Sequence, residues 1–171
     1  MEKNVFDLQE YITPALGSLG RAIVASYYRW TQRELIPGMH TNVYSMDDRI
    51  VLQQLFEHNG VILAHNTATD PTFVFANPTA IKLWEYDWTE IIGLPSRLTA
   101  EPDLRPNREQ LLARVRDFGY IDDYSGIRVS KSGRRFRIEQ ATVWNIIDST
   151  ERRIGQAATF SHWTPLTENQ S

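Results

Sequence analysis

The strongest constraint on the fold of this chain is a run of alternating apolar and polar residues over positions 124–147, broken in the middle by the turn-like stretch SKSG. Side chains of a β-strand point alternately to opposite faces of a sheet, so this pattern predicts two strands joined by a tight turn. A third β-prone segment follows over residues 153–163. The last third of the chain therefore predicts three antiparallel strands.

Two shorter β-prone runs, GVILAHN and PTFVFAN, begin at Gly60 and are separated by the turn-like TATD. Short helices are expected next, because Asn77 precedes a proline as an N-cap does and Asn107 opens a longer amphipathic segment. The buried side of that segment is predicted to be Leu111, Leu112 and Val115. The order predicts an α+β fold, a five-stranded antiparallel sheet with helices over one face and a small cavity between them.

The first 59 residues predict a helical extension. From Leu16 onward, apolar residues recur at the spacing that stacks them on one helical face, and Tyr27 and Trp30 close that series. A second helix is expected to end near Asn59. We therefore divide the chain into an extension over residues 1–59, a domain over 60–163, and a tail over 164–171 that we expect to be disordered.

Composition removes several classes of function. The net charge of −3 argues against a protein whose main partner is nucleic acid, since such proteins carry a large basic surplus. The absence of cysteine excludes disulfides, thiolate nucleophiles and cysteine-bound metals. The sequence starts without a basic segment leading into an apolar run, and it has no apolar stretch near the ~18 residues of a membrane span. We expect a cytoplasmic protein with no membrane or nucleic-acid partner.

Three stretches carry a resemblance to a known family: DPTFVFANPTAIKLWEYDWTEIIGLPSRLTAEP, GYIDDYSGIRVSKSGRRFRIEQATVWNII and GQAATFSHW. They closely resemble the MEKHLA domain, a relative of PAS sensory domains found at the C-terminus of plant class III homeodomain–leucine-zipper proteins and as small stand-alone proteins. The strong part of the match covers about residues 60–163. The resemblance implies a PAS-like fold and a sensing or protein-interaction role.

Flavin and haem are not expected as cofactors. PAS relatives that sense blue light carry a Gly-x-x-Cys-Arg-Phe run, and GLPSRL has the same frame with Ser96 in place of the cysteine and Arg97 at the flavin-phosphate arginine. The two asparagines that such domains aim at the flavin fall at Arg128 and Ile138. The helix over residues 107–118 lacks a histidine for haem, and the four histidines lack the spacing of a metal cluster.

The face that Arg128 takes depends on the register of the hairpin. If Ser-Gly alone forms a two-residue turn, Arg128 lies on the outer face, opposite the apolar residues. If the loop has three residues with Gly133 in the left-handed conformation, Arg128 points inward with Phe136 and Ile138. A buried guanidinium is costly unless it is paired, so an inward Arg128 needs either a protein carboxylate or an anionic ligand. Both alternatives remain open from the sequence.

The outer sheet face is expected to be covered. Alternation over residues 135–147 places Val143 and Ile147 on the same outer face as the arginines, which makes that face partly apolar. The N-terminal helix, with Tyr27 and Trp30, is the nearest cover, from the same chain or from a partner. We take these four residues as interface candidates and expect a homodimer.

Two non-enzymatic roles remain, because no base stands beside a nucleophile and no paired carboxylates face one cleft. The first is a sensory module that binds a small, anionic ligand between sheet and helices and signals through an unidentified partner protein. The second is a ligand-free interaction or dimerisation module. The residues that we expect to line the pocket are Arg128, Arg97, Ser96, Phe73, Phe75, Asn77, Trp84, Phe136, Ile138 and Trp144.

Overall fold

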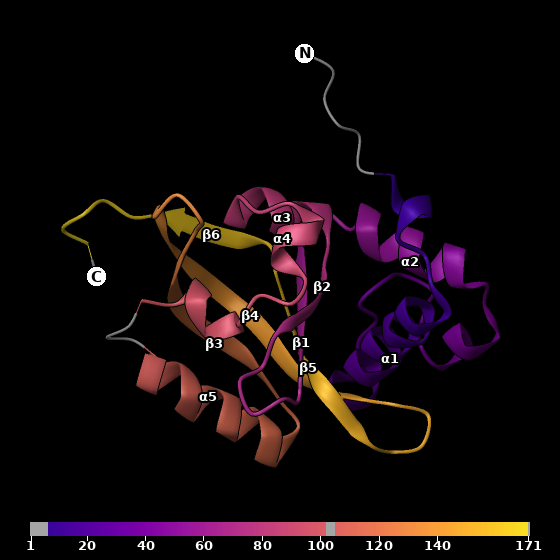
Figure 1. Ribbon diagram of the computed structural model, residues 1–171. Helices are drawn as coiled ribbons and strands as arrows, with labels where there is room; N and C mark the ends of the chain where they lie inside the picture. The colour runs from indigo at the N-terminus through magenta and orange to yellow at the C-terminus, as the bar shows by residue number, and fades with distance from the viewer. Residues whose placement is uncertain (1–6, 102–104, 171) are drawn as a thin grey trace.

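The computed structural model describes residues 7–101 and 105–170, and it contains one antiparallel sheet between two groups of helices (Figure 1). The strands are β1 (Val61–Asn66), β2 (Phe73–Ala76), β3 (Tyr120–Val129), β4 (Arg135–Ile147), β5 (Arg153–Phe160) and β6 (His162–Pro165). The α-helices are α1 (Pro14–Thr31), α2 (Asp48–Glu57), α3 (Pro78–Trp84), α4 (Trp88–Ile91) and α5 (Arg105–Phe118). Short 3-10 helices are η1 (Leu8–Glu10), η2 (Thr41–Ser45) and η3 (Ser96–Thr99).

The sheet order is β2-β1-β5-β4-β3, which confirms the predicted five-stranded antiparallel arrangement. The last predicted strand is divided at Ser161 into β5 and β6, and both segments pair with β4. The chain after Trp163, expected to be disordered, continues this pairing as far as Pro165, and Leu166 then donates its backbone N–H to the carbonyl of Arg135.

Each face of the sheet has its own hydrophobic core. The core on one face, called here the pocket face, contains Leu63, Phe73, Trp84 and Phe160, and it is covered by α3 and α4 with α5 farther along. The core on the outer face joins the sheet to α1 and α2. Figure 1 shows α1 and α2 on one side of the strands and α5 on the other. The short helices after β2 therefore cover one face and the N-terminal helices cover the other, which confirms the expected fold with its helical extension.

The β3–β4 hairpin has the three-residue loop that turns Arg128 inward. Ser130 donates its N–H to the carbonyl of Arg134, and Gly133 between them has a φ of +89°. In the resulting register Arg128 lies opposite Phe136, whose side chain belongs to the pocket-face core. The two-residue turn is therefore excluded, and Arg128 faces the helices rather than solvent.

Gly133→Ala is expected to lower the free energy of unfolding by about 1 kcal/mol, because a β-carbon is strained in the left-handed region. Among the described residues, none apart from the chain neighbours of Gly133 has an atom within 4 Å of the position that the new methyl group would take, so backbone strain dominates the effect. Urea unfolding measures it. Gly133→Asn is the matched control and should lose less than half as much, since asparagine tolerates this conformation. Equal losses for both variants would contradict the argument.

Two β-bulges reverse the alternation of side chains along β2 and β4. In β2 the extra residue is Val74, opposite the step from Ala64 to His65. In β4 it is Gln140, which has a φ of +51°: two residues of β3 span the same length as three of β4. Each extra residue moves every later side chain to the opposite face of the sheet.

The bulges correct three sequence-based expectations. Phe75 and Trp144 were expected in the pocket, but both belong to the outer-face core. Val143 was expected on the outer face, but it is buried on the pocket face and lines the cavity there. Strict alternation assigns the wrong face to every residue after a bulge, because it does not include the reversal that the extra residue causes.

The cover of the outer face comes from α1 of the same chain. Tyr27 packs edge-on against Trp144, with ring centroids 5.0 Å apart. Trp30 donates its indole N–H to the carbonyl of Asn145 at 2.9 Å, and Ser26 exchanges two hydrogen bonds with the backbone of Ile147. Three of the interface candidates, Tyr27, Trp30 and Ile147, therefore make contacts within the chain. The fourth, Val143, lies in the wall of the cavity.

Candidate functional site: a cavity with two arginines

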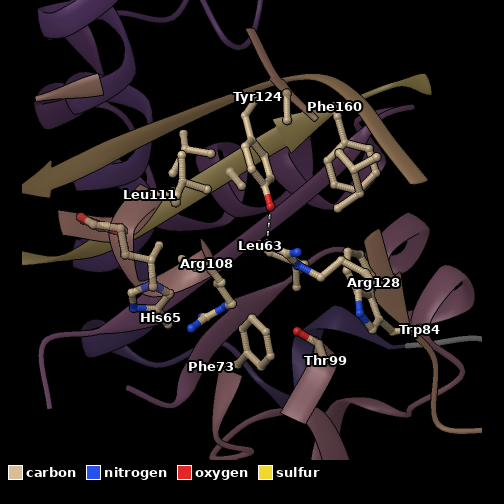
Figure 2. Close-up of a pocket in the computed structure, with 18 residues that line it drawn as sticks. Leu63, His65, Phe73, Trp84, Thr99, Arg108, Leu111, Tyr124, Arg128 and Phe160 are labelled. Atoms are coloured by element: carbon tan, nitrogen blue, oxygen red, sulfur yellow. Dashed lines mark hydrogen bonds between the residues drawn. The ribbon is translucent and has the colours of Figure 1, made fainter. Parts of the chain in front are cut away.

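A cavity of about 70 Å³ lies between the pocket face of the sheet and α5 (Figure 2). Its walls are mainly apolar. Strands β1 and β5 form the floor, β3 and β4 one side, and α3 and α5 the cover, with one residue each from β2 and η3. The apolar side chains among the lining residues include Leu63, Phe73, Trp84, Leu111, Leu112, Ile138, Val143 and Phe160.

Two arginines enter this apolar space from different elements. Arg108 projects from the first part of α5, is only 7% exposed, and donates to the hydroxyl of Ser96. Arg128 projects from β3 and donates to the hydroxyl of Tyr124 at 2.7 Å and to the carbonyl of Ile127 at 2.9 Å. Figure 2 shows both side chains directed into the same space, with a dashed line from Arg128 to Tyr124.

Neither guanidinium has a carboxylate partner among the residues that the structure describes. Burial, followed by the nearby charge of Arg128, lowers the pKa of Arg108 to about 10. Arg108 is still positively charged at neutral pH. The cavity thus holds two positive groups whose charge no described ion pair neutralises.

Three further polar atoms around the cavity are buried and have no hydrogen-bond partner within residues 7–101 and 105–170: His65 Nε2, Gln156 Oε1 and Trp84 Nε1. Buried polar atoms in folded proteins are nearly always paired, with protein or with a bound molecule. Burial is the main reason that the pKa of His65 falls to about 4, and the charges of Arg108 and Arg153 act in the same direction. His65 is therefore neutral at physiological pH.

A second, more open cleft of about 300 Å³ adjoins the cavity. The two share Arg108, Tyr124 and Arg128, and the cleft adds Asn107 and Arg137 to its lining. The guanidiniums therefore lie where the mainly apolar cavity and the neighbouring cleft meet. An anion entering between α5 and β3 would meet them first.

Comparison with known proteins places this architecture in a family. The sequence profile of the MEKHLA domain matches residues 18–165, which is most of the chain. This chain belongs to the MEKHLA domain family. The matched region of this MEKHLA domain begins inside α1, so it includes the helices that cover the outer face as well as the sheet.

Curated relatives of this MEKHLA domain are plant homeobox–leucine zipper proteins. The Arabidopsis thaliana protein ATHB-9 is 27% identical over 163 residues, which is 90% of this chain and 19% of the relative. REVOLUTA, also from Arabidopsis thaliana, is 25% identical over 168 residues, 90% of this chain and 20% of the relative. The chain thus spans about a fifth of the length of these relatives.

Solved structures show the same fold at low identity. A PAS domain from Colwellia psychrerythraea superposes with a TM-score of 0.57 at 14% identity, covering 71% of this chain and 98% of that one. An RNA-binding light-oxygen-voltage receptor superposes with a TM-score of 0.57 at 19% identity, covering 78% of this chain and 35% of that one. The MEKHLA domain therefore has a PAS-like fold.

The expected pocket residues of the MEKHLA domain fall into three groups. Arg128, Phe73, Trp84 and Ile138 line the cavity. Ser96 and Phe136 lie one layer behind it, Ser96 against Arg108 and Phe136 edge-on against Trp84 at 5.1 Å. The others lie elsewhere: Arg97, Asn77, Phe75 and Trp144.

Arg97 and Asn77 leave the pocket for separate reasons. Arg97 is exposed and pairs with Asp70 of the β1–β2 turn, Nε to Oδ1 at 3.1 Å, so it is not a pocket donor. Asn77 is fully buried, but it caps α3 and ties three segments together. Its Oδ1 accepts from the N–H groups of Ile62 and Ala80 at 3.1 Å each, and its Nδ2 donates to the carbonyl of Gly60 at 2.8 Å.

Five polar residues that line the cavity are not among the expected pocket residues: Arg108, His65, Thr99, Tyr124 and Gln156. The sequence does indicate that Arg108 is buried. It precedes Leu111 by three positions and Val115 by seven, so it shares their buried helical face. A charged residue on the apolar side of an amphipathic helix marks a functional candidate. The sequence does not indicate the positions of His65 and Gln156, because a single polar residue in a short strand does not show which face of the sheet it takes.

Proposed function

We propose that this MEKHLA domain is a sensory module that binds a small anion between its sheet and α5 and signals the bound state through protein contacts. One observation carries the proposal: two guanidiniums, Arg108 and Arg128, face one largely apolar cavity without a carboxylate partner in the described residues. The partner protein, the cytoplasmic location and the absence of flavin or haem stay predictions, as does a non-enzymatic role.

The energetics favour a ligand over a purely structural role for the pair. A buried charge carries a desolvation penalty of several kcal/mol unless an opposite charge offsets it, and two like charges at one cavity add repulsion. A carboxylate or phosphate that accepts hydrogen bonds from both guanidiniums would remove both penalties. The hydroxyl of Tyr124, which accepts from Arg128, remains free to donate its own proton to the same anion.

A ligand-free interaction module is the second candidate. The cavity of about 70 Å³ is small beside ligand pockets of roughly 300–1,000 Å³. Arg128 already has two acceptors of its own, at Tyr124 and Ile127. Under this alternative the arginines are structural, and signalling depends on surfaces alone. A homodimer remains a prediction under either candidate.

The two candidates predict opposite effects for Arg108→Met. If Arg108 serves a ligand, removing its uncompensated charge should raise the free energy of unfolding of the ligand-free protein by about 1 kcal/mol. The same variant should weaken the binding of the best-bound anion at least about tenfold, since charged hydrogen bonds are lost. Urea unfolding measures the first effect. Calorimetric titration with inorganic phosphate and with carboxylates from acetate to hexanoate measures the second.

Arg114→Met is the matched control, because Arg114 lies on the same helix with its side chain exposed. It should change stability by less than about 0.5 kcal/mol and leave anion binding unaltered. Arg128→Met should repeat the loss of binding. A large destabilisation by Arg108→Met, together with no anion binding by the wild-type protein, would favour the interaction module instead.

A further inference from the structure

The floor of the cavity differs in chemistry from its mouth. His65 of β1 and Gln156 of β5 are direct partners across the two strands, and both line the cavity. Residues directly opposite each other in an antiparallel pair have their β-carbons about 5 Å apart. Each residue has one buried polar atom, His65 Nε2 and Gln156 Oε1, that no other described residue contacts by a hydrogen bond. These two atoms form a polar spot in an otherwise apolar floor.

Both unpartnered atoms are hydrogen-bond acceptors. His65 Nδ1 lies 2.8 Å from the carbonyl oxygen of Asn66, which can only accept, so Nδ1 carries the hydrogen and Nε2 carries a lone pair. The amide nitrogen of Gln156 donates to the carbonyl of Leu112 at 2.9 Å and to Asn145 Oδ1 at 3.3 Å. A flipped amide would aim its oxygen at these two acceptors, so the orientation with Oε1 as the free acceptor is fixed.

The two ends of the cavity therefore require different groups from a ligand. Arg108 and Arg128 stand where the cavity meets the cleft, whereas His65 and Gln156 line the cavity alone. The geometry points to a small acid that carries a neutral hydrogen-bond donor, a hydroxyl or an N–H, at the end opposite its anionic group. This inference rests on the proposed anion site and adds the second recognition element of the same ligand.

A neutral donor fits the floor better than an ammonium. Of the described side chains that line the cavity, none is a carboxylate that would neutralise a cation. The charge of Arg108 reaches the floor, since it acts on the titration of His65, and it would repel an ammonium. A hydroxyl or N–H needs only the two lone pairs that are present.

The volume limits the length of this acid. A cavity of about 70 Å³ holds roughly five water molecules, because each needs about 10–15 Å³. The part of the ligand beyond its anionic group is therefore only a few non-hydrogen atoms long. Short-chain hydroxy acids have this combination of charge, size and donor.

Calorimetric titration with matched pairs of acids tests the inference. The probes are the straight-chain carboxylates acetate to hexanoate, each paired with the acid of the same length that carries a terminal hydroxyl. For the length that spans the cavity, the hydroxy acid should bind the wild-type protein about tenfold or more tightly than its parent, because two buried acceptors gain their partner. The parent acids should show no such preference for one length.

Variants of the floor separate the two recognition elements. Gln156→Met and His65→Phe remove one acceptor each, and each should reduce the preference for the hydroxy acid while leaving parent-acid binding dependent on Arg108. Circular dichroism melts establish that each variant is folded, and one folded variant is sufficient. Equal affinity for hydroxy and parent acids would overturn the inference and leave the anion site standing. Binding of neither series, with no binding of inorganic phosphate either, would overturn both the inference and the anion site. A preference that persists in a folded variant would overturn the assignment to His65 and Gln156.

Discussion

Trp144→Ala is expected to lower the free energy of unfolding by about 4 kcal/mol, in the range of large aromatic truncations in protein cores. Trp144 is fully buried on the outer face of the sheet, packs edge-on against Tyr27, and donates its indole N–H to the carbonyl of Ile23 at 3.3 Å. The substitution removes the ring, leaves a cavity, and deletes the hydrogen bond from the indole to the carbonyl of Ile23, which keeps only its donor within α1. The contact that holds α1 to the sheet should weaken most.

Urea unfolding measures the total loss, and amide hydrogen exchange shows where it falls. Amides of α1 should exchange faster in the variant by a larger factor than amides of α5, which lies on the other face. Phe118→Ala is the matched control, because Phe118 is 75% exposed and its loss should change stability by less than about 0.5 kcal/mol. A loss below about 1 kcal/mol for Trp144→Ala would mean that α1 does not depend on the sheet for its position.

Acidification from pH 6.5 toward pH 4 is expected to lower the stability of the wild-type protein by about 3 kcal/mol through His65 alone. The pKa of His65 is about 4 in the folded protein, against 6.5 for an unperturbed histidine. In this window the unfolded chain binds a proton that the folded protein does not, so stability is complete above pH 6.5 and decreases as the pH falls. Each pKa unit corresponds to about 1.4 kcal/mol.

Urea unfolding at pH 7.5, 5.5 and 4.5 tests this, with His65→Phe as the comparison. The window lies above the range in which the surface carboxylates of Glu85, Asp87, Glu90 and Asp148 titrate, because hydrogen bonds to neighbouring groups lower the pKa of each of them. The variant should therefore lose clearly less stability than the wild type between pH 7.5 and 4.5. Parallel losses in the two proteins would refute the assignment to His65.

The sequence was sufficient to predict the sheet, because turn residues and alternation mark its strands directly. It was insufficient for the face of each side chain beyond a bulge. Val74 and Gln140 look like ordinary strand residues, and both sheet faces are apolar, so no change in pattern announces the extra residue. Phe75 and Trp144 were misplaced for that reason.

For the site, the sequence allowed the side chain of Arg128 to lie on either face of the sheet. The left-handed conformation of Gly133, which belongs to the three-residue loop, decides for the inward face. The apolar residues of α5 do not by themselves place Arg108 in the site, because a charged residue is ordinarily assigned to the exposed face. The pairing of His65 with Gln156 depends on the register between two strands about ninety residues apart in sequence. Sequence patterns carry no information on such a long-range register, so this part of the site required the fold.

Helices α1 and α2 cover the outer face of the sheet, and this affects how such a domain can occur in proteins of different architecture. A sheet with one bare apolar face depends on whatever protein it is attached to, and it aggregates or misfolds in a new setting. Here both apolar faces are buried by helices inside the region that matches the family, residues 18–165. A domain of this kind buries its own apolar surface and can therefore be joined to different proteins. The similarity to ATHB-9 is limited in the same way to one segment, 19% of the length of that much longer protein.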